Sequence, residues 1–390
     1  MILSSLLLLA VASATKSRFI PGPEDNTIDN QNGQLRVAPF AVDTPELVIG
    51  GIFSLSNNGT RLPNESGVQR AIAFECAIES VNNGQVGFQM PTKFFYNIQD
   101  DGSSAPWAVR AAVRLQNDGV PVVVGPSSSD QAVSTAPVYG SLALPLLSPA
   151  ATSDSLSDTV NFPSFFRLVP ADVAQARAIA AACVYFNWSL ITPIYTSDEY
   201  GISGSLAFSA EANRNRISFT CGRTIRPGET NGIQNTNLCL DVSDSNVVLL
   251  YMAASDASNV IAEMYSDESN GRLTFLASDA WADIQDFRLF SRNRFPPSFL
   301  EGALGFAPEL GDQKPYRQCA STYTPGNNDI PNFDRFWEIT FRCSLNPESA
   351  LPDCPKGIYR DRDYTRIACK CNGDESLSQV PPDVEFRFNE

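Results

Sequence analysis

The sequence predicts an α/β fold built as two successive lobes, and three observations support this prediction. The chain has 390 residues, and at roughly 100 to 200 residues per domain this length suggests two domains or one domain with two lobes. From Glu46 onward, short apolar runs alternate with amphipathic segments, which is the pattern of a mostly parallel sheet with helices on its faces. The alternation occurs as two consecutive sets of similar size, so each set is expected to form its own sheet.

The expected elements follow from the length and spacing of the apolar runs. The first set comprises strand 47–55, helix 67–81, strand 94–97, helix 105–115, strand 120–124, a helix after Ser129, and strands 144–147 and 165–169. The second set comprises helix 172–186, strand 189–195, helix 201–213, strands 217–221 and 247–252, helix 256–267 and strand 273–277. An extended run at 300–307 and a helix at 333–341 follow, and regular structure fades beyond Ser344.

The first 45 residues differ from the two lobes. Met1 to Ala14 is almost wholly apolar and ends in a small-x-small site, which predicts a secretory signal peptide. Residues 15–45 are polar and show no steady period, so they are interpreted as a leader. No later apolar run approaches the roughly 20 residues that a bilayer requires, so the mature chain is expected to be secreted or extracellular.

The composition excludes several classes of function. The net charge is −15, with 28 basic against 43 acidic residues, so the clustered positive charge that nucleic-acid binders need is not expected. The sequence contains no histidine, which excludes Ser-His-Asp and Cys-His nucleophiles and histidine-ligated zinc. We therefore expect neither an enzyme nor a resident metal or cofactor.

The nine cysteines and three sequons fit an exported protein. Nine is odd, so at least one thiol has no partner within the chain. Cys76 and Cys183 lie in helical patterns among apolar neighbours and are interpreted as free buried thiols. A C-terminal group is expected to tie loops together by disulfides: Cys343, Cys354, Cys369 and Cys371. The sequons, which are candidates for glycosylation, begin at Asn58, Asn64 and Asn187.

Two runs in the first set place hydroxyl groups at the ends of strands. Ser129 follows Val122 to Val124 and a Gly-Pro turn, at the start of an expected helix whose free N–H groups attract an anion. Thr152 follows the next strand, and ligands of open α/β sheets bind outside the carboxyl ends of the strands. The alternative for both residues is a structural role in a cap or a turn.

Three residues of the second set have the chemistry of an ammonium site. Asp279 comes directly after a strand and lies near Trp281. Tyr200 ends a strand-to-helix loop, where the alternative is a lid over the core. Asp172 begins a helix with Gln175 three positions on, and a capping box would also explain this pair.

Taken together, these motifs resemble the ligand-binding ectodomain of class C G-protein-coupled receptors, most closely metabotropic glutamate receptors. The resemblance spans about 46–377 and is specific in its order of motifs: Gly125 to Ser129, Ala151 to Ser153 with Leu156 to Asp158, Phe166 to Asp172, Gln175 to Ala178, Phe186 to Trp188, Asp198 to Gly201, Ser278 to Asp283 and Phe336 to Cys343.

The resemblance implies a two-lobed Venus-flytrap clamshell of the periplasmic-binding-protein type I class, with an α-amino acid held between the lobes. By position, Ser129 and Thr152 match residues that hold the α-carboxylate and α-amino groups, and Asp172, Tyr200 and Asp279 match residues around the ammonium. Arg70 matches an arginine that holds a distal carboxylate, which favours a glutamate-like ligand. Around Arg70 the match is only partial, since the family's other residues for the distal carboxylate are replaced by Ser66 and Ile284.

The resemblance also implies disulfides and boundaries. Cys343 is expected to pair with Cys369 or Cys371, and Cys221 with Cys239. The family's disulfide near the N-terminus of the first lobe is expected to be missing. The implied segments are a signal peptide at 1–14, a leader at 15–45, lobe 1 at 46–165, lobe 2 at 166–300, and a return to an incomplete lobe 1 at 301–390.

The expected function is that of the extracellular amino-acid-binding module of such a receptor, in which ligand binding drives lobe closure and signalling. A homodimer through lobe 1 is a further expectation, and a full-length protein would carry a membrane domain that lies outside this sequence. The alternative is a secreted amino-acid carrier or decoy without a membrane domain.

Overall fold

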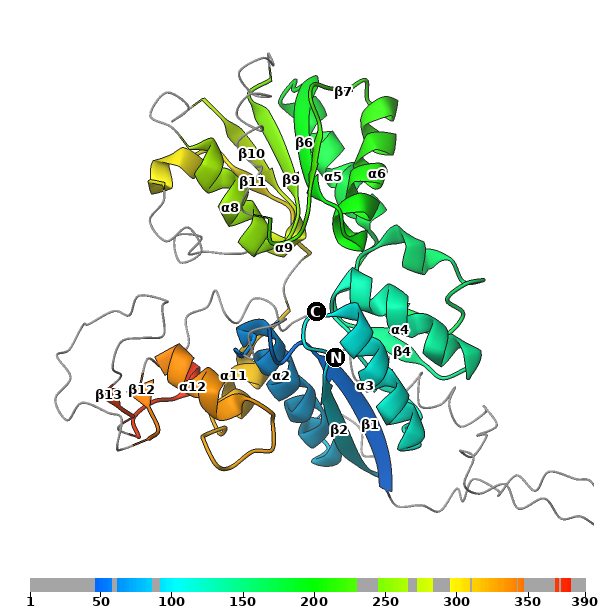
Figure 1. Cartoon of the computed structure of the whole chain (residues 1–390), viewed down its shortest axis with the longest axis vertical. Coiled ribbons are helices and arrows are strands. Elements are labelled where there is room, and N and C mark those ends of the chain that lie inside the picture. Colours follow the sequence, from blue (N-terminus) through cyan, green and yellow to red (C-terminus); the bar gives the residue numbers. More distant parts are fainter. Residues whose placement is uncertain are drawn as a thin grey trace, which may run out of the picture.

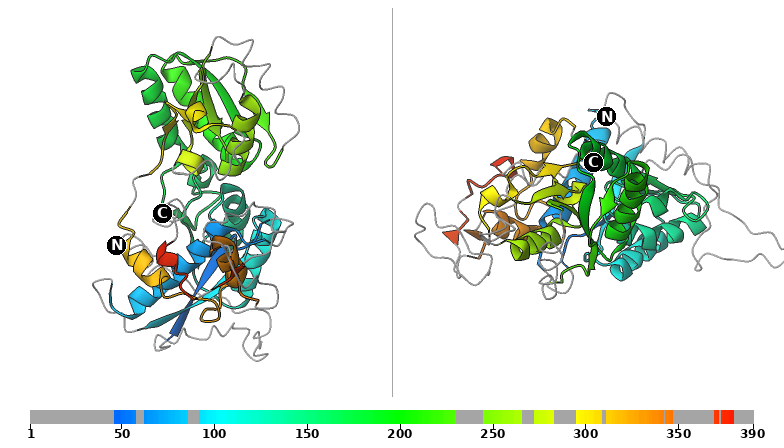
Figure 2. Two further views of the ribbon diagram at one scale, coloured as in Figure 1. Left: turned by 90° about the vertical axis from the view of Figure 1, so that its left-hand side faces the viewer. Right: turned by 90° about the horizontal axis from the view of Figure 1, so that it is seen from above.

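Two α/β lobes make up the computed structural model (Figure 1). The structure describes residues 46–57, 62–85, 92–229, 245–265, 272–282, 295–308, 311–341, 343–346, 369–371 and 373–379. In Figure 1 the lower lobe contains the N-terminal elements in blue and cyan together with late helices in orange, whereas the upper lobe is green and yellow. The views in Figure 2 show the same two bodies joined by chain crossings. The α/β fold with two flanked parallel sheets is confirmed.

Lobe 1 is built on a five-stranded parallel sheet of order β2-β1-β3-β4-β5. Its strands are β1 (Glu46–Phe53), β2 (Lys93–Asp100), β3 (Val123–Val124), β4 (Leu146–Ser148) and β5 (Phe165–Arg167). Its helices are α2 (Glu65–Asn82), α3 (Ala105–Asn117) and α4 (Ser129–Ser141), with the 3-10 turn η1 (Asp154–Ser157). β1 lies between β2 and β3, and its side chains Ile49 and Ile52 are wholly buried.

Lobe 2 is built on a second parallel sheet of order β11-β10-β9-β6-β7, with β8 also paired to β6. Its strands are β6 (Leu190–Thr196), β7 (Ser218–Phe219), β8 (Arg223–Ile225), β9 (Val247–Tyr251), β10 (Thr274–Ala277) and β11 (Leu304–Gly305). Its helices are α5 (Asp172–Tyr185), α6 (Glu199–Arg214), α8 (Ala254–Met264) and α9 (Asp279–Ala282), with the 3-10 turn η2 (Pro297–Leu300). All five residues of β9 are buried, as expected for a central strand covered on both faces.

The chain passes between the lobes more than once. β5 pairs with β4, so residues 165–167 complete the first sheet, and the second lobe begins with α5 at Asp172. β11 pairs with β10, so residues 304–305 still belong to lobe 2. The helices α11 (Lys314–Ala320) and α12 (Phe333–Phe341) then pack against α2 of lobe 1. The first crossing therefore lies between Arg167 and Asp172 and the return between Gly305 and Lys314, a few residues after the expected boundaries at 165 and 300.

The return segment is joined to lobe 1 by a disulfide that the sequence pattern did not indicate. Cys76 on α2 bonds to Cys319 on α11 over a sequence separation of 243 residues. The interpretation of Cys76 as a free thiol was therefore wrong, because its apolar helical neighbours are equally compatible with a bridge to a distant helix. Cys183 is a free buried cysteine, as predicted.

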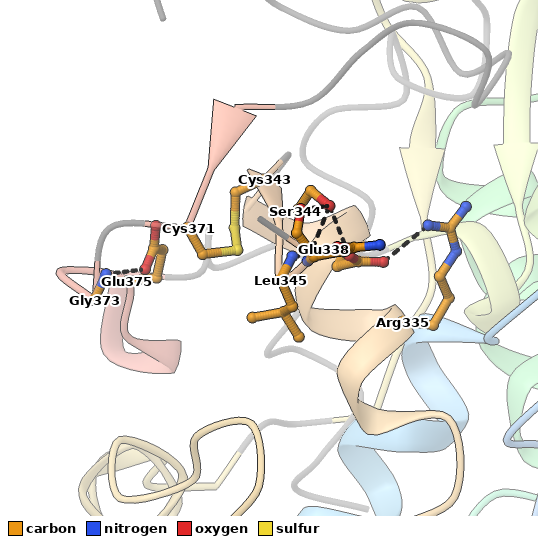
Figure 3. The surroundings of a disulfide bond; sticks show 9 residues. Arg335, Glu338, Cys343, Ser344, Leu345, Cys371, Gly373 and Glu375 are labelled. Atoms are coloured by element: carbon orange, nitrogen blue, oxygen red, sulfur yellow. Dashed lines mark hydrogen bonds and ion pairs between the residues drawn. A yellow bond between two sulfur atoms is a disulfide. The ribbon is translucent and has the colours of Figure 1, made fainter. Parts of the chain in front are cut away.

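The disulfide expected at Cys343 is present, and of the two expected partners, Cys369 and Cys371, it is Cys371 that forms the bond. Cys343 bonds to Cys371, and Figure 3 shows this bridge beside the side chains of Glu338 and Arg335. The backbone of Cys369 pairs with that of Cys343, where β13 (Cys369–Lys370) runs parallel to β12 (Cys343–Ser344). The 3-10 turn η3 (Leu377–Gln379) follows.

Several predictions fall on residues that the structure does not describe or describes in part. The signal peptide, the leader, Asn58, Cys239, Cys354 and Ile284 lie outside the described residues. Cys221 is disulfide-bonded, and its expected partner lies among those residues. Of the two described sequons, Asn64 caps α2 by accepting from Gly67 N at 3.1 Å, whereas Asn187 is exposed. Within the described ranges, every helix is too short or too polar to cross a membrane.

Candidate ligand-binding site

A cavity of about 320 Å³ opens where the first turn of α5 meets the ends of several strands. Thr152 contributes from lobe 1, four residues after β4, and Asp279 contributes from lobe 2, two residues after β10. Loops at the carboxyl ends of parallel strands converge at one edge of each sheet, which explains why residues distant in sequence meet here. The lining comprises Thr152, Pro170, Ala171, Asp172, Ala174, Gln175, Ala178, Asp279, Gly305, Phe306, Ala307 and Pro308.

Asp279 is held at the cavity by two donors. The hydroxyl of Tyr200 and the side-chain nitrogen of Gln175 both donate to its Oδ1, the latter at 3.1 Å. Burial raises the pKa of Asp279, and the hydrogen bonds from Tyr200 and Gln175 oppose part of this rise. Burial beside the same carboxylate also raises the pKa of Tyr200 well above its ordinary value, so its hydroxyl remains a donor. The tyrosine is thus part of a polar network and not merely a lid.

Asp172 is the first residue of α5, and the residue at the N-cap is Ala171. The capping-box interpretation of Asp172 and Gln175 is therefore wrong, because both side chains bond to other elements of lobe 2. The Asp172 carboxylate accepts from the Tyr251 hydroxyl at 2.9 Å. Burial raises the pKa of Asp172 to about 6, although the hydroxyls of Ser203, Thr152 and Tyr251 moderate the rise. Its Oδ2 is buried without a hydrogen-bond partner of good geometry in the described part of the chain.

Thr152 connects the lobes at the cavity. Its carbonyl accepts from the backbone N–H of Asp172 at 2.9 Å and from Arg167 Nη1 at 3.0 Å. The backbone is therefore fixed from both sides, and the side chain is left for another role. Thr152 Oγ1 is buried without a hydrogen bond of good geometry to any described residue, although it lies close enough to the Asp172 carboxyl to lower the pKa of that group.

Ser129 is close to this segment but does not line the cavity. Its Oγ accepts from the backbone N–H of Ser153 at 3.2 Å, and the residue is buried. The N-cap residue of α4 is Ser128, so Ser129 is the first residue of that helix. In this conformation Ser129 supports the backbone next to Thr152.

Arg70 lies on α2 in lobe 1 and is not among the residues that line the cavity. Its charged neighbour is the buried Asp101. Burial raises the pKa of Asp101 to about 6, and the positive charge of Arg70 opposes the rise. Among the described lining residues none is basic, so a second charge partner for a distal carboxylate is not found there.

Sequence reasoning missed two residues of the site as functional candidates. Gln175 was interpreted only as half of a capping box, although its spacing of three from Asp172 already places both side chains on one face of α5. Phe306 follows β11 directly and contributes to the wall, but the run 300–307 offered only an extended pattern. The described lining therefore combines acidic and hydroxyl oxygens with an apolar wall.

Two α/β lobes, each built on a parallel sheet, with a cavity at their junction that Thr152 and Asp279 line from either side, define a two-lobed protein of the periplasmic-binding-protein type. Residues 69–349 match the family model described as "Receptor family ligand binding region", which covers most of the chain. The chain therefore belongs to this family. Its members are receptor ligand-binding regions and not enzymes.

Similarity to full-length proteins points to class C G-protein-coupled receptors. The chain is 28% identical over 271 residues to the extracellular calcium-sensing receptor of Sus scrofa and 29% identical over 272 residues to that of Homo sapiens. Each match covers 66% of this chain and 24% of the relative, so the chain spans about a quarter of these curated relatives. The resemblance to class C ectodomains is thus confirmed, and the particular likeness to metabotropic glutamate receptors is not singled out.

Proposed function

We propose that this chain is the extracellular α-amino-acid-binding region of a class C receptor. The observation that carries the proposal is the cavity in which Thr152 Oγ1 and Asp172 Oδ2 are buried beside the carboxylate of Asp279 without a hydrogen bond of good geometry to any described residue. An ammonium group offers three N–H donors and a positive charge, which matches two acids and a hydroxyl. The α-carboxylate would lie toward Thr152 and the N-terminus of α4, which begins at Ser129 and whose helix dipole attracts an anion.

The ligand's side chain would lie against the apolar wall formed by Ala174, Ala178, Phe306 and Pro308. This wall accommodates neutral and aromatic amino acids as readily as acidic ones. A glutamate preference depends on Arg70, and therefore remains a prediction that only binding measurements test. Loss of a glutamate-over-glutamine preference in an Arg70→Ala variant would support it.

The name of the relatives raises calcium as a second ligand. Among the described residues, the group of potential metal ligands that lie close enough together is Cys343, Cys371 and Glu375. The two cysteines of that group form a disulfide, and a disulfide sulfur is not a thiolate ligand. The cavity geometry therefore favours an amino acid, with calcium as a comparison in the binding assay.

Signalling would arise from a shift of population between open and closed lobes. A ligand that contacts Thr152 from lobe 1 and Asp279 from lobe 2 binds the closed state better, and this differential affinity is what drives the shift. A secreted carrier would close in the same way without passing the change to a membrane domain. The receptor and the carrier differ in whether the full-length protein has a membrane domain.

A homodimer through lobe 1 is supported by the outer face of α3. Trp107 is 53% exposed and Val113 40% exposed, and Arg110 lies over the indole ring at 4.9 Å. Exposed aromatic and arginine side chains are enriched at protein interfaces. Analytical ultracentrifugation of Trp107→Ala against the wild-type chain would show whether this face carries the dimer.

The proposal is tested by calorimetric titration of the chain with each of the twenty amino acids and with calcium. Thr152→Ala and Asp279→Asn should each weaken binding of the best amino acid about 10-fold or more, because each removes a charge-assisted hydrogen bond of about 1.5–3 kcal/mol. The control is Asp118→Asn, an aspartate at the exposed end of α3. Unchanged affinity in both site variants, with folding verified by circular dichroism, would refute the proposed site.

A further inference from the structure

Gln175 connects three parts of the cavity wall. It lies in the first turn of α5, and its side-chain nitrogen donates to Asp279 Oδ1 at 3.1 Å and to the backbone carbonyl of Phe306 at 3.0 Å. One amide group therefore holds the carboxylate that follows β10 and the segment that follows β11. These two contacts give Gln175 a fixed orientation.

The fixed orientation of the amide also determines the role of its oxygen, Gln175 Oε1. Both partners of the nitrogen are acceptors, so the amide cannot be turned over without losing both hydrogen bonds. Gln175 Oε1 is then necessarily an acceptor, and it is buried without a partner among the described residues. Leaving a buried acceptor unpaired is costly, so a ligand that brings a donor to this atom is favoured.

Two further buried oxygens of the same lining also lack a hydrogen bond of good geometry to the described residues. They are Thr152 Oγ1 and Asp172 Oδ2, which come from lobe 1 and from the same helix turn as Gln175. The Thr152 hydroxyl can donate to Asp172 and still accept, so these atoms offer three acceptors for the three N–H groups of a primary ammonium. An N-methylated amine brings fewer donors and a methyl group in place of one of them.

We propose that Gln175 is a specificity-determining residue that makes the site select primary over N-methylated amino acids. This inference rests on the proposed function, because it assigns a residue to the ammonium subsite of the same cavity. Gln175 acts in two ways: its Oε1 accepts from the ligand ammonium, and its nitrogen positions Asp279 for the same group. Selection follows because a methylated nitrogen leaves one buried acceptor unpaired.

The test measures discrimination and not affinity alone. Calorimetric titrations would compare three matched pairs on wild type: L-alanine, L-phenylalanine and L-glutamate, each against its N-methyl derivative. For the pair that binds, wild type should prefer the primary amine by about 10-fold or more, about 1.4 kcal/mol. Gln175→Met keeps a similar side-chain length without the amide, and should reduce the preference for the primary amine to less than about 3-fold. Gln116→Met, a half-buried glutamine on α3 that lies outside the cavity lining, is the matched control and should keep the wild-type ratio.

The outcomes separate this inference from the function on which it rests. If wild type binds none of the twenty amino acids, the proposed function and this inference both fail. If wild type binds primary and N-methyl amines equally, or if Gln175→Met keeps the full discrimination while binding, only the role of Gln175 is overturned. A general structural defect would weaken both members of a pair alike and leave the ratio unchanged, which also contradicts the inference. Gln175→Leu provides a second variant if the methionine variant does not fold.

Discussion

Asp172 shows how one residue can favour ligand binding and oppose folding. Its side chain is almost fully buried, and burial raises the pKa of its carboxyl group to about 6. A carboxyl group whose folded-state pKa is raised stabilises the fold fully only below its unfolded pKa, about 3.9, and loses this contribution as the pH rises through about 6. At neutral pH the ionised Asp172 carboxylate therefore destabilises the unliganded chain, and a ligand ammonium would offset this cost by pairing with its charge.

The first residue-scale prediction is that Asp172→Asn stabilises the unliganded chain at pH 7.5. The amide imitates the neutral acid and can still accept from Tyr251. The shift of about two pH units converts to a gain on the order of 1–3 kcal/mol in the free energy of unfolding, which should vanish near pH 3.5. Urea unfolding at both pH values measures the difference, with Asp118→Asn as the exposed control. An equal loss of stability at both values would contradict this account.

The same variant should bind the amino-acid ligand less tightly, because it removes a negative charge from the ammonium site. Stability and affinity are thus expected to change in opposite directions. A variant that merely disturbed folding would lower both quantities.

At the scale of elements, α2 and α11 are the junction that brings the return segment back to lobe 1. The Cys76–Cys319 disulfide joins them, and beside it the Tyr323 hydroxyl donates to the buried Glu75 at 2.9 Å. Burial raises the pKa of Glu75 to about 7, although the Tyr323 hydrogen bond opposes the rise, so the buried carboxyl destabilises the fold as it ionises through neutral pH. The disulfide therefore supports a junction that carries a buried acid.

The element-scale prediction compares two of the disulfides. Replacing Cys76 and Cys319 together by serine should lower the free energy of unfolding by about 2–4 kcal/mol, because the bridge restricts a loop of 243 residues in the unfolded chain. The matched control is the Cys343 and Cys371 double variant, whose bridge spans 28 residues and should cost less. Chemical denaturation of both variants at one pH gives the comparison, and a larger loss in the control would speak against the loop-length explanation.

At the scale of the whole molecule, polar contacts connect the lobes next to the cavity. Glu199, the first residue of α6 in lobe 2, accepts from the Ser153 and Ser155 hydroxyls of lobe 1, each at 2.7 Å. Its backbone N–H donates to Asp130 Oδ1 at 3.0 Å. These residues are the sequence neighbours of Thr152, Tyr200 and Ser129, so the proposed ligand residues and the contact between the lobes lie on the same turns.

The whole-molecule prediction is that an amino-acid ligand compacts the chain. The radius of gyration from small-angle X-ray scattering should fall when the best amino acid is added to wild type at saturation, since closure brings the lobes together. Asp279→Asn at the same ligand concentration should show a smaller decrease, because the population shifts only as far as differential affinity allows. An unchanged radius at a ligand concentration that saturates calorimetric binding would exclude closure.

Much of the cavity could be anticipated from strand ends. Thr152 and Asp279 both follow short apolar strands, and parallel strands bring such positions to one edge, so their approach follows from local pattern and topology. Gln175 could not be assigned in this way. Its partners are Asp279 and the Phe306 carbonyl, which lie 104 and 131 residues away, and a local pattern offered only a capping box.

The sequence by itself determined the two α/β lobes, the kinds of residues at the strand ends and the family, because hydrophobic periodicity and turn chemistry act over a few residues at a time. Only the tertiary structure decided that Cys76 bonds to Cys319, that Asp172 lies inside the cavity beside Tyr251, and that Arg70 lies outside its lining. The physical reason is that disulfide pairing, desolvation and the closing of a cavity depend on the packing of segments far apart in the chain. Local periodicity does not indicate which distant segments of the chain come into contact.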